Sequence, residues 1–372
     1  MCAMDEVAEI ARKVLLPPVK VINERSHFEK RFQREWSTKV DDAVCDLKKL
    51  VLNGTSVTKE EWTKNSQDVL SLLILCGEHS ICSEWSTQKS VDNVKDLLNL
   101  LLSKLHLQNI QDIFAMEGVA YSTLQQLKPK LGKNQIKENP AAVSCFVWII
   151  SNTMLPSIDE SVDFAVPVSL VLFDDWEPDY QKKGLECLHH ILSLNPKSLL
   201  QRGWFAVIFS ALKKNVEFND KFNLYKCLDI CLKAQNLDPD DPSQWNQDDQ
   251  YDSLASDVLK SMIIQDSPSA TSCNLKILIL IFHSMKIKMA KFLPSIISVL
   301  DNYVTVGVSP EIHVLSAEVM EQIVEYCWVC LEPQFTRQLT WILFKLAKEN
   351  VIDEVTKRKI VNLQELLKQV SL

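Results

Sequence analysis

The sequence predicts an all-α fold, a superhelical array of antiparallel helix pairs of the HEAT or armadillo kind. Apolar residues recur at spacings of three and four along almost the whole 372-residue chain, and no stretch alternates as a strand does. Only seven glycines occur, whereas an average usage of roughly 7% would give about 26. Asn53-Gly54 is the single candidate for a tight hairpin turn.

Prolines, Ser, Thr or Asp starts and short polar gaps mark where the predicted helices begin and end. Pro17-Pro18 stops the first helix, and Thr58 opens the fourth with Glu61 as its capping box. A lysine-rich gap precedes residue 140. The predicted helices cover residues 3–16, 19–35, 38–53, 58–77, 90–106, 109–128, 140–154, 157–173, 178–194, 196–214, 219–236, 250–264, 271–287, 289–304, 310–330, 333–349 and 352–370.

The short gaps require neighbouring helices to lie roughly antiparallel. The spacing from pair to pair is about 40 to 45 residues, which fits HEAT or armadillo repeats better than the tetratricopeptide period. A modest break falls at 131–139, where glycine, asparagine and proline interrupt the pattern. We therefore expect N-terminal helical repeats over 1–139 and C-terminal HEAT-like repeats over 140–372.

Composition excludes several classes of function. The net charge of −8 does not favour broad binding to nucleic acids or anionic membranes. No two glycines are close enough to form a phosphate-binding loop, and no apolar run approaches the roughly 20 residues of a membrane span. Eleven cysteines, most of them within apolar runs, and an acidic start unlike a signal peptide indicate a reducing compartment. We expect the cytoplasm, and the nucleus as a second location.

The sharpest motif is LVLFDDWEPDYQKKGLECLHHIL, residues 170–192, which predicts the turn between two paired helices. Asp174 and Asp175 end one helix and can cap the next. Pro178 falls in the first turn of the second helix, where a missing N–H is tolerated. Gly184 lies inside that helix at a cost of about 1 kcal/mol relative to alanine, so we expect a neighbouring helix to pass very close.

Two further features fit a HEAT layout. Lys182 or Lys183 can reach back to an aspartate of this turn or of an adjoining repeat. A weaker echo of the motif, SPEIHVLSAEVMEQIV, spans Ser309 to Val324, with Pro310 in its first turn and Ala317 at the small position. We expect Asp174→Ala or Gly184→Leu to destabilise the repeat and to weaken partner binding together.

The segment DDWEPDYQKKGLECL resembles the signature of the TELO-two-interacting protein two family, the small subunit of the Triple-T cochaperone complex. The resemblance covers about residues 150–236 and includes LLQRGWFAVIFSALKKNVEF, residues 199–218. It is not evident before residue 140. The matching residues of the signature are Asp174, Asp175, Trp176, Glu177, Tyr180, Lys183 and Gly184.

This resemblance implies a non-enzymatic adaptor without a cofactor. It implies two larger helical-repeat partners, and a complex that works with the HSP-ninety chaperone system to mature phosphatidylinositol-3-kinase-related kinases, including mTOR and the DNA-damage kinases. The alternatives are another helical-repeat scaffold, of the phosphatase-scaffold or transport-receptor kind, and an α-helical enzyme. Sparse glycine and the lack of a convergent polar set argue against the enzyme.

Other patterns admit a functional and a structural interpretation. Cys327 and Cys330 form a CxxC pair that reads as buried core, since no strand or second pair accompanies it. A zinc site from Cys187, His190, Cys227 and Cys231 requires their helices to touch, and an ordinary apolar stripe is the simpler explanation. The seven histidines are scattered and form no catalytic pattern.

Surface segments are similarly ambiguous. The acidic loop 238–252 is a docking peptide, a weak calcium site or a solvated insertion, and the insertion is favoured because the loop lacks the glycine and the terminal glutamate of an EF-hand. The lysine-rich segment 128–137 reads as a solvated linker, and 25–34 reads as the polar face of a helix. Aromatic residues near helix ends are candidate contacts for partners, although packing of the helix ends explains each one singly; these are Trp36, Trp62, Trp85, Trp176, Trp204 and Trp245.

Overall fold

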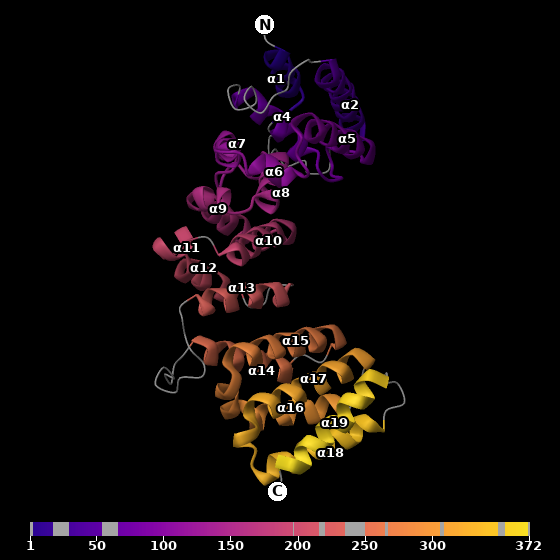
Figure 1. The fold of residues 1–372 in the computed structure, drawn as a ribbon, viewed down its shortest axis with the longest axis vertical. Helices are drawn as coiled ribbons and strands as arrows, with labels where there is room; N and C mark the ends of the chain where they lie inside the picture. Colours follow the sequence, from indigo (N-terminus) through magenta and orange to yellow (C-terminus); the bar gives the residue numbers. More distant parts are fainter. Residues whose placement is uncertain are drawn as a thin grey trace. The chain divides into compact units, whose positions relative to one another are not determined.

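The computed structural model confirms an all-α chain (Figure 1). It describes residues 3–17, 30–53, 66–195, 197–215, 220–234, 250–264, 267–305, 309–348 and 354–370, and no strand occurs within these ranges. The chain divides into two compact units, Met1–Trp204 and Phe205–Leu372. The interruption at 131–139 lies inside the first unit.

The first unit is a set of helices that pack on other helices near them along the chain. Its elements are α1 (Ala3–Lys13), α2 (Lys30–Asn53), α4 (Ser66–Glu78), α5 (Gln88–Leu105), α6 (Ile110–Phe114), α7 (Val119–Leu127), the 3-10 turn η1 (Lys128–Lys130), α8 (Pro140–Asn152), α9 (Ser157–Phe173), α10 (Pro178–Leu194) and α11 (Lys197–Gln201).

The second unit continues the same kind of packing. Its elements are α12 (Trp204–Lys213), α13 (Lys221–Lys233), α14 (Gln250–Ile264), α15 (Pro268–Met285), η3 (Lys286–Phe292), α16 (Leu293–Thr305), α17 (Pro310–Cys327), η4 (Trp328–Cys330), α18 (Pro333–Ala347) and α19 (Glu354–Val370).

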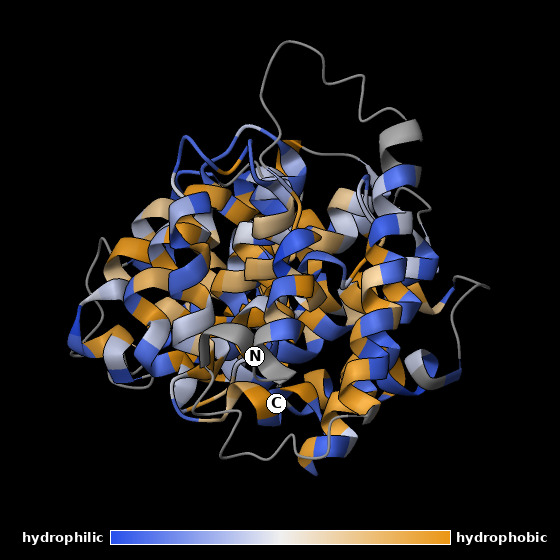
Figure 2. Cartoon of the chain, turned by 90° about the horizontal axis from the view of Figure 1, so that it is seen from above, coloured by the Kyte–Doolittle hydropathy of each residue, from blue (hydrophilic) through white to orange (hydrophobic). Residues whose placement is uncertain are grey.

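Within each unit the helices contact the next helix but one, which is the contact pattern of stacked pairs. In the first unit α7 packs on α9 and α8 packs on α10; in the second, α13 packs on α15, α15 on α17, and α17 on α19. Figure 2 shows helices with apolar residues along one side and hydrophilic residues along the other. The apolar sides meet in the cores, where large side chains such as Phe146, Phe173 and Phe282 are fully buried.

Polar contacts between successive pairs reveal the length of the repeat. The Ser198 N–H donates to Asp159 Oδ1 across 39 residues, Lys213 donates to Ser253 Oγ across 40, and Lys345 pairs with Asp301 across 44. Side chains of stacked pairs meet at one repeat length, so these separations agree with the repeat period predicted from the gaps between helices.

Two predicted helices are each divided by a glycine. The helix expected over 109–128 is α6 and α7, because Gly118 adopts φ 72° between them. The helix expected over 196–214 is α11 and α12, because Gly203 adopts φ 69°. Glycine adopts this left-handed conformation readily, and a residue in this conformation ends a right-handed helix.

Other boundaries differ less. The predicted break between residues 35 and 38 is wrong, because α2 runs without interruption from Lys30 to Asn53 and buries Ser37. The helix expected over 289–304 begins as the 3-10 segment η3 and becomes α16 at Leu293. The Thr58 capping box and most of the acidic loop 238–252 lie outside the described residues. The predicted bounds of α9, α10 and α14 match those observed.

Candidate functional site at the α9–α10 corner

The corner between α9 and α10 begins where the backbone leaves α9. The Asp174 N–H donates to the Leu170 carbonyl at 2.9 Å, and the Asp175 N–H donates to the Leu172 carbonyl at 3.2 Å, so both aspartates remain bonded to the end of α9. Asp175 Oδ1 accepts the Glu177 N–H at 2.8 Å, which fixes the short turn. Pro178 then occupies the first turn of α10, as the sequence predicts.

A lysine from the preceding repeat holds the corner together. The Lys137 ammonium lies 2.5 Å from Asp175 Oδ1 and 3.3 Å from Glu177 Oε1. It also lies 3.8 Å from the centre of the Tyr180 ring and 5.4 Å from that of Trp176. One largely buried cation therefore binds two carboxylates and two aromatic rings, and it links the turn to the segment before α8.

Sequence reasoning assigned this role to the wrong lysines. Lys182 pairs with Glu186 on its own helix at 3.9 Å, and Lys183 lies over the Tyr180 ring at 5.6 Å. Burial is the main cause that lowers the pKa of Lys183. The sequence predicts that Lys137 belongs to a solvated linker, which is wrong for this side chain. The available signal was its position 38 residues before Asp175, close to one repeat length.

Gly184 is where the two helices touch. A Cβ atom built at this position lies 2.4 Å from the Phe173 nitrogen and 2.6 Å from the Ser169 carbonyl oxygen, both of which belong to the backbone of α9. No side chain fits at that distance. The close passage that an internal glycine predicts is therefore present.

The motif thus divides into a part within the fold and a part on its surface. Asp175, Glu177, Tyr180 and Gly184 are buried or half-buried and make the contacts just described. Trp176 is 72% exposed, although Lys137 lies against one side of it. The fold needs little of this indole surface, and exposed tryptophans are frequent centres of protein interfaces.

Asp174 belongs to the exposed part as well. Its side chain is 73% exposed, and its carboxylate lies 3.7 Å from the ammonium of Lys133, which is equally exposed. The sequence treats the two aspartates alike, whereas the structure gives the turn-forming role to Asp175. The exposed surface of the corner therefore includes the Trp176 indole and the Asp174 carboxylate, with Pro178 and Asp179 beside them.

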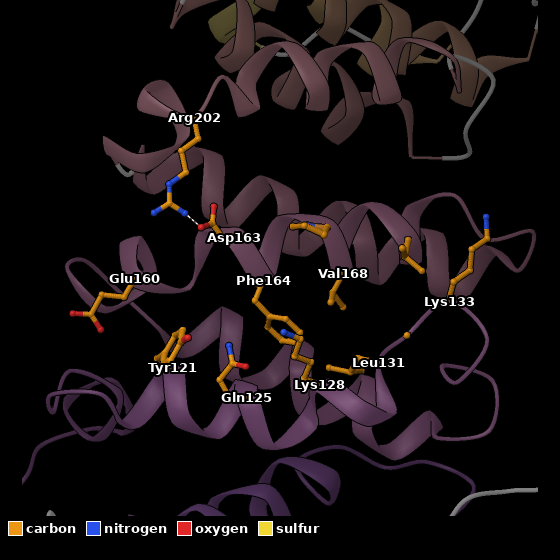
Figure 3. A pocket seen from close by; sticks show the side chains of 13 residues that line it. Tyr121, Gln125, Lys128, Leu131, Lys133, Glu160, Asp163, Phe164, Val168 and Arg202 are labelled. Carbon is orange, nitrogen blue, oxygen red and sulfur yellow. Dashed lines mark ion pairs between the residues drawn. The ribbon is translucent and has the colours of Figure 1, made fainter.

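A groove of about 860 Å³ lies beside the corner, between α7 and α9 (Figure 3). Tyr121, Gln125 and Lys128 line it from α7 and η1, and Phe164 and Val168 line it from α9. Its remaining lining residues are Leu131, Gly132, Lys133, Glu160, Asp163, Pro167, Val171 and Arg202. Lys133 belongs both to this groove and to the ion pair with Asp174, so the groove and the corner form one continuous surface.

The cysteines and the histidine considered as metal ligands lie in ordinary packing positions. Cys187, Cys227, Cys231 and Cys327 are buried, and burial raises their pKa. Cys330 is exposed, so the prediction of a buried core position is wrong for that member of the CxxC pair. A ring nitrogen of His190 lies 3.0 Å from the Thr153 carbonyl oxygen. In the part of the chain that the structure describes, no three His, Cys, Asp or Glu side chains are grouped as metal ligands.

The tryptophans considered as contacts differ in their surroundings. Trp85 is buried and donates its indole N–H to the Glu78 carbonyl, and Trp36 packs partly buried against the cluster that contains Trp85. Trp204 lies within 3.5 Å of Asp163. Trp62 and Trp245 lie outside the described residues. Sequence reasoning did not single out Trp328 and Trp341, which are also exposed and lie in the second unit.

Residues 56–218 match the family model described as the Tti2 family. We call residues 56–218 the Tti2 segment, because their sequence is similar to that family. TELO2-interacting protein 2 of Homo sapiens is 28% identical over 160 residues, and the alignment covers 41% of this chain and 31% of the human protein. The proteins of Rattus norvegicus and Mus musculus with that name are 28% and 27% identical over the same shares.

The Tti2 match confirms the resemblance drawn from the corner motif, and it begins earlier than sequence reasoning placed it, at residue 56. It contains the whole corner and the whole groove. The aligned part spans less than a third of each named relative. A crystal structure described as an engineered protein aligns over 98% of this chain at 12% identity and a TM-score of 0.42, too low to establish a shared topology.

The relatives are named for an interaction and not for a reaction. None of the described helices is both long enough and apolar enough to cross a lipid bilayer. The Tti2 segment contains two candidate features for the recognition of a partner, which are the exposed side of the corner and the groove beside it.

Proposed function

We propose that this chain is a non-enzymatic adaptor that binds a TELO2-like helical-repeat protein and a second large helical-repeat subunit in a Triple-T type cochaperone complex. Through these partners and the HSP-ninety system, it supports the folding and stability of phosphatidylinositol-3-kinase-related kinases, among them mTOR and the DNA-damage kinases. The reducing compartment expected from the cysteines, cytoplasm with nucleus, belongs to the same proposal.

The observation that carries the proposal is that the corner has a buried part and an exposed indole. The buried part consists of Lys137, Asp175 and Glu177 and is called the buried mount below; the indole is that of Trp176. Lys137 and its carboxylates fix the backbone on either side of Trp176, so the indole is presented with little freedom to lose on binding. A rigid aromatic anchor gives much contact area at a low entropic cost. The name of the relatives supports TELO2 as the partner class.

Affinity purification of the full tagged chain from its native cells tests the proposal, with quantitative mass spectrometry of the recovered proteins. We expect a TELO2-like protein and a second large helical-repeat protein in near-stoichiometric amounts, with the kinases at lower yield. Recovery of importins or of a phosphatase catalytic subunit in their place would show that the chain is a different kind of helical-repeat scaffold.

A matched pair of variants locates the contact. Trp176→Ala removes the exposed indole of the corner and is expected to lower recovery of the TELO2-like protein at least several-fold. Trp341→Ala removes an indole of comparable exposure, 55%, that lies outside the Tti2 segment. It is expected to leave that recovery unchanged. Equal loss in both variants would argue against the corner as the contact.

A further inference from the structure

The groove between α7 and α9 has the geometry that receives a helix. Figure 3 shows Tyr121 and Glu160 at one end of the two helices and Lys128 and Val168 further along, so α7 and α9 run in the same direction. They belong to successive repeats and pack against each other below the groove. A third helix can lie along the channel between two such parallel helices.

The groove has an apolar floor held by the core. Phe164 meets Phe146 edge to face, with ring centres 6.2 Å apart, and so cannot turn freely. Val168 and Leu131 are buried beside it. The half-buried side chains of Phe164, Pro167 and Val171 leave apolar surface that the leucine-sized residues of an amphipathic helix would cover.

The two ends of the groove differ in charge. Lys128 and Lys133 lie at the end where α7 and α9 run towards their C-termini. Glu160 and Asp163 lie at the other end, in the first half of α9, and Asp163 pairs with Arg202. After that ion pair the acidic end retains one net negative charge from these three residues. The basic end retains one net positive charge from Lys128, Lys133 and Asp174, because Lys133 pairs with Asp174.

We propose that an amphipathic helix of a partner protein docks in this groove antiparallel to α9, with its acidic first turn beside Lys128 and Lys133 and its basic last turn beside Glu160. The inference rests on the adaptor function proposed above, and it adds the chemistry and direction of the bound segment. The orientation follows from charge. Helices favour acidic residues in the first turn and basic residues in the last.

Two synthetic peptides test the orientation. Each is an amphipathic helix of about 18 residues, roughly 27 Å long, with leucines at positions i, i+3, i+4 and i+7. One carries two glutamates first and two lysines last, and its isomer carries the lysines first. Fluorescence anisotropy with the full chain is expected to give binding about tenfold tighter for the acid-first peptide.

A charge-swapped chain separates the effect of the groove from the helicity of the peptides. Lys128→Glu combined with Glu160→Lys exchanges the charges of two exposed side chains and keeps the net charge, so the preference is expected to reverse. Lys182→Glu combined with Glu186→Lys makes the same exchange on α10, away from the groove, and is the matched control. Binding of neither peptide, or an unchanged preference in the swapped chain, would overturn the proposal.

Crosslinking in the assembled complex tests the occupant itself. A photoreactive phenylalanine analogue replaces Tyr121, which is 43% exposed and lines the groove, or Ile81, an exposed control residue outside it. We expect the Tyr121 position alone to crosslink to a partner segment whose sequence is an amphipathic helix of the stated charge order. Adducts only to a second copy of this chain, or to an extended segment, would refute the proposal. So would an intact complex without a crosslink, which would leave the adaptor function standing.

Discussion

The α9–α10 corner and the start of α17 use the same parts in different surroundings. In both, an acidic residue near the start of a helix binds a lysine of the preceding repeat. Asp175 lies 2.5 Å from Lys137, and Glu311 lies 2.8 Å from Lys276. The first carboxylate is 9% exposed and the second 55%.

This difference in burial decides what each contact contributes. Water screens the exposed pair at α17, so this pair contributes little to the stability of the fold. Removal of one partner from a buried pair leaves an uncompensated charge, which costs about 3 to 5 kcal/mol. The hydrogen bond from Lys276 is the main cause that lowers the pKa of Glu311, yet that pair remains a surface contact. The two corners therefore share a sequence pattern and differ in strength.

Substitutions of Gly184, the small residue of the α9–α10 corner, are expected to change stability most. Gly184→Leu places a side chain against the α9 backbone and is expected to destabilise the chain by more than about 5 kcal/mol, enough to unfold the first unit. Gly184→Ala is the sharper test. Alanine normally stabilises a helix by about 1 kcal/mol relative to glycine, whereas here we expect a loss of about 2 to 3 kcal/mol. Urea unfolding followed by circular dichroism measures both.

Two variants act as controls for this clash. Ala317→Gly at the echo corner creates no overlap and is expected to cost only about 1 kcal/mol of helix propensity. At Gly132, a Cβ atom would meet nothing nearer than 3.9 Å, so Gly132→Ala is expected to change stability by less than about 0.5 kcal/mol. A stabilising Gly184→Ala would mean that α9 and α10 are not in contact there.

Substitution of Lys137, the lysine of the α9–α10 corner, is expected to give the next largest loss of stability. Lys137→Ala leaves Asp175 and Glu177 without their cation and is expected to lower the free energy of unfolding by about 3 kcal/mol or more. Lys276→Ala, the matched change at α17, is expected to lower it far less, because water screens that exposed pair. The same urea titrations compare them. Similar losses in the two variants would contradict the ranking by burial.

A pH titration extends the comparison to buried carboxyl groups elsewhere. The second unit buries Asp252 beside Lys288 and Lys291, whereas Glu78 of the first unit has one cation, Lys130, 3.9 Å away. Burial raises the pKa of Glu78 from 4.5 to about 7. The folded chain therefore keeps this proton up to a higher pH than the unfolded chain does.

The sign of the effect follows from this raised pKa. The stabilisation from protonated Glu78 is complete below pH 4.5 and is lost as the pH rises to about 7, a change of at most about 3 kcal/mol. Burial also lowers the pKa of the adjacent His79 to about 4, but that group is present in both proteins when wild type is compared with Glu78→Gln. We expect wild type to lose stability relative to Glu78→Gln over this range. A constant difference would contradict the prediction.

Much of the fold was predictable from the sequence because local signals dominate it. Pro178 at the start of α10 and the apolar periodicity of α9 gave the bounds of both helices. Gly118 and Gly203 were harder, since a glycine within a helical pattern either packs closely, as Gly184 does, or adopts a positive φ. Only the positions of neighbouring helices distinguish the two cases.

The site was less predictable because it depends on register between repeats. The motif residues were identifiable, yet their division into a buried mount and an exposed surface was not. Lys137 lies in a segment whose local composition is that of a solvated linker, and only its stacking one repeat before Asp175 gives it a role. The charge order of the groove likewise arises from residues on four separate segments.

The central claim is that the corner combines a buried mount with an exposed binding surface. The substitution that tests this claim most directly, Trp176→Ala, is also the one expected to change stability least. Purified Trp176→Ala is compared with wild type for its thermal unfolding midpoint and for its affinity towards the isolated TELO2-like partner. We expect an unchanged midpoint and binding weakened by about tenfold or more. Unchanged affinity, or a loss of affinity that only accompanies a lower unfolding midpoint, would contradict the account.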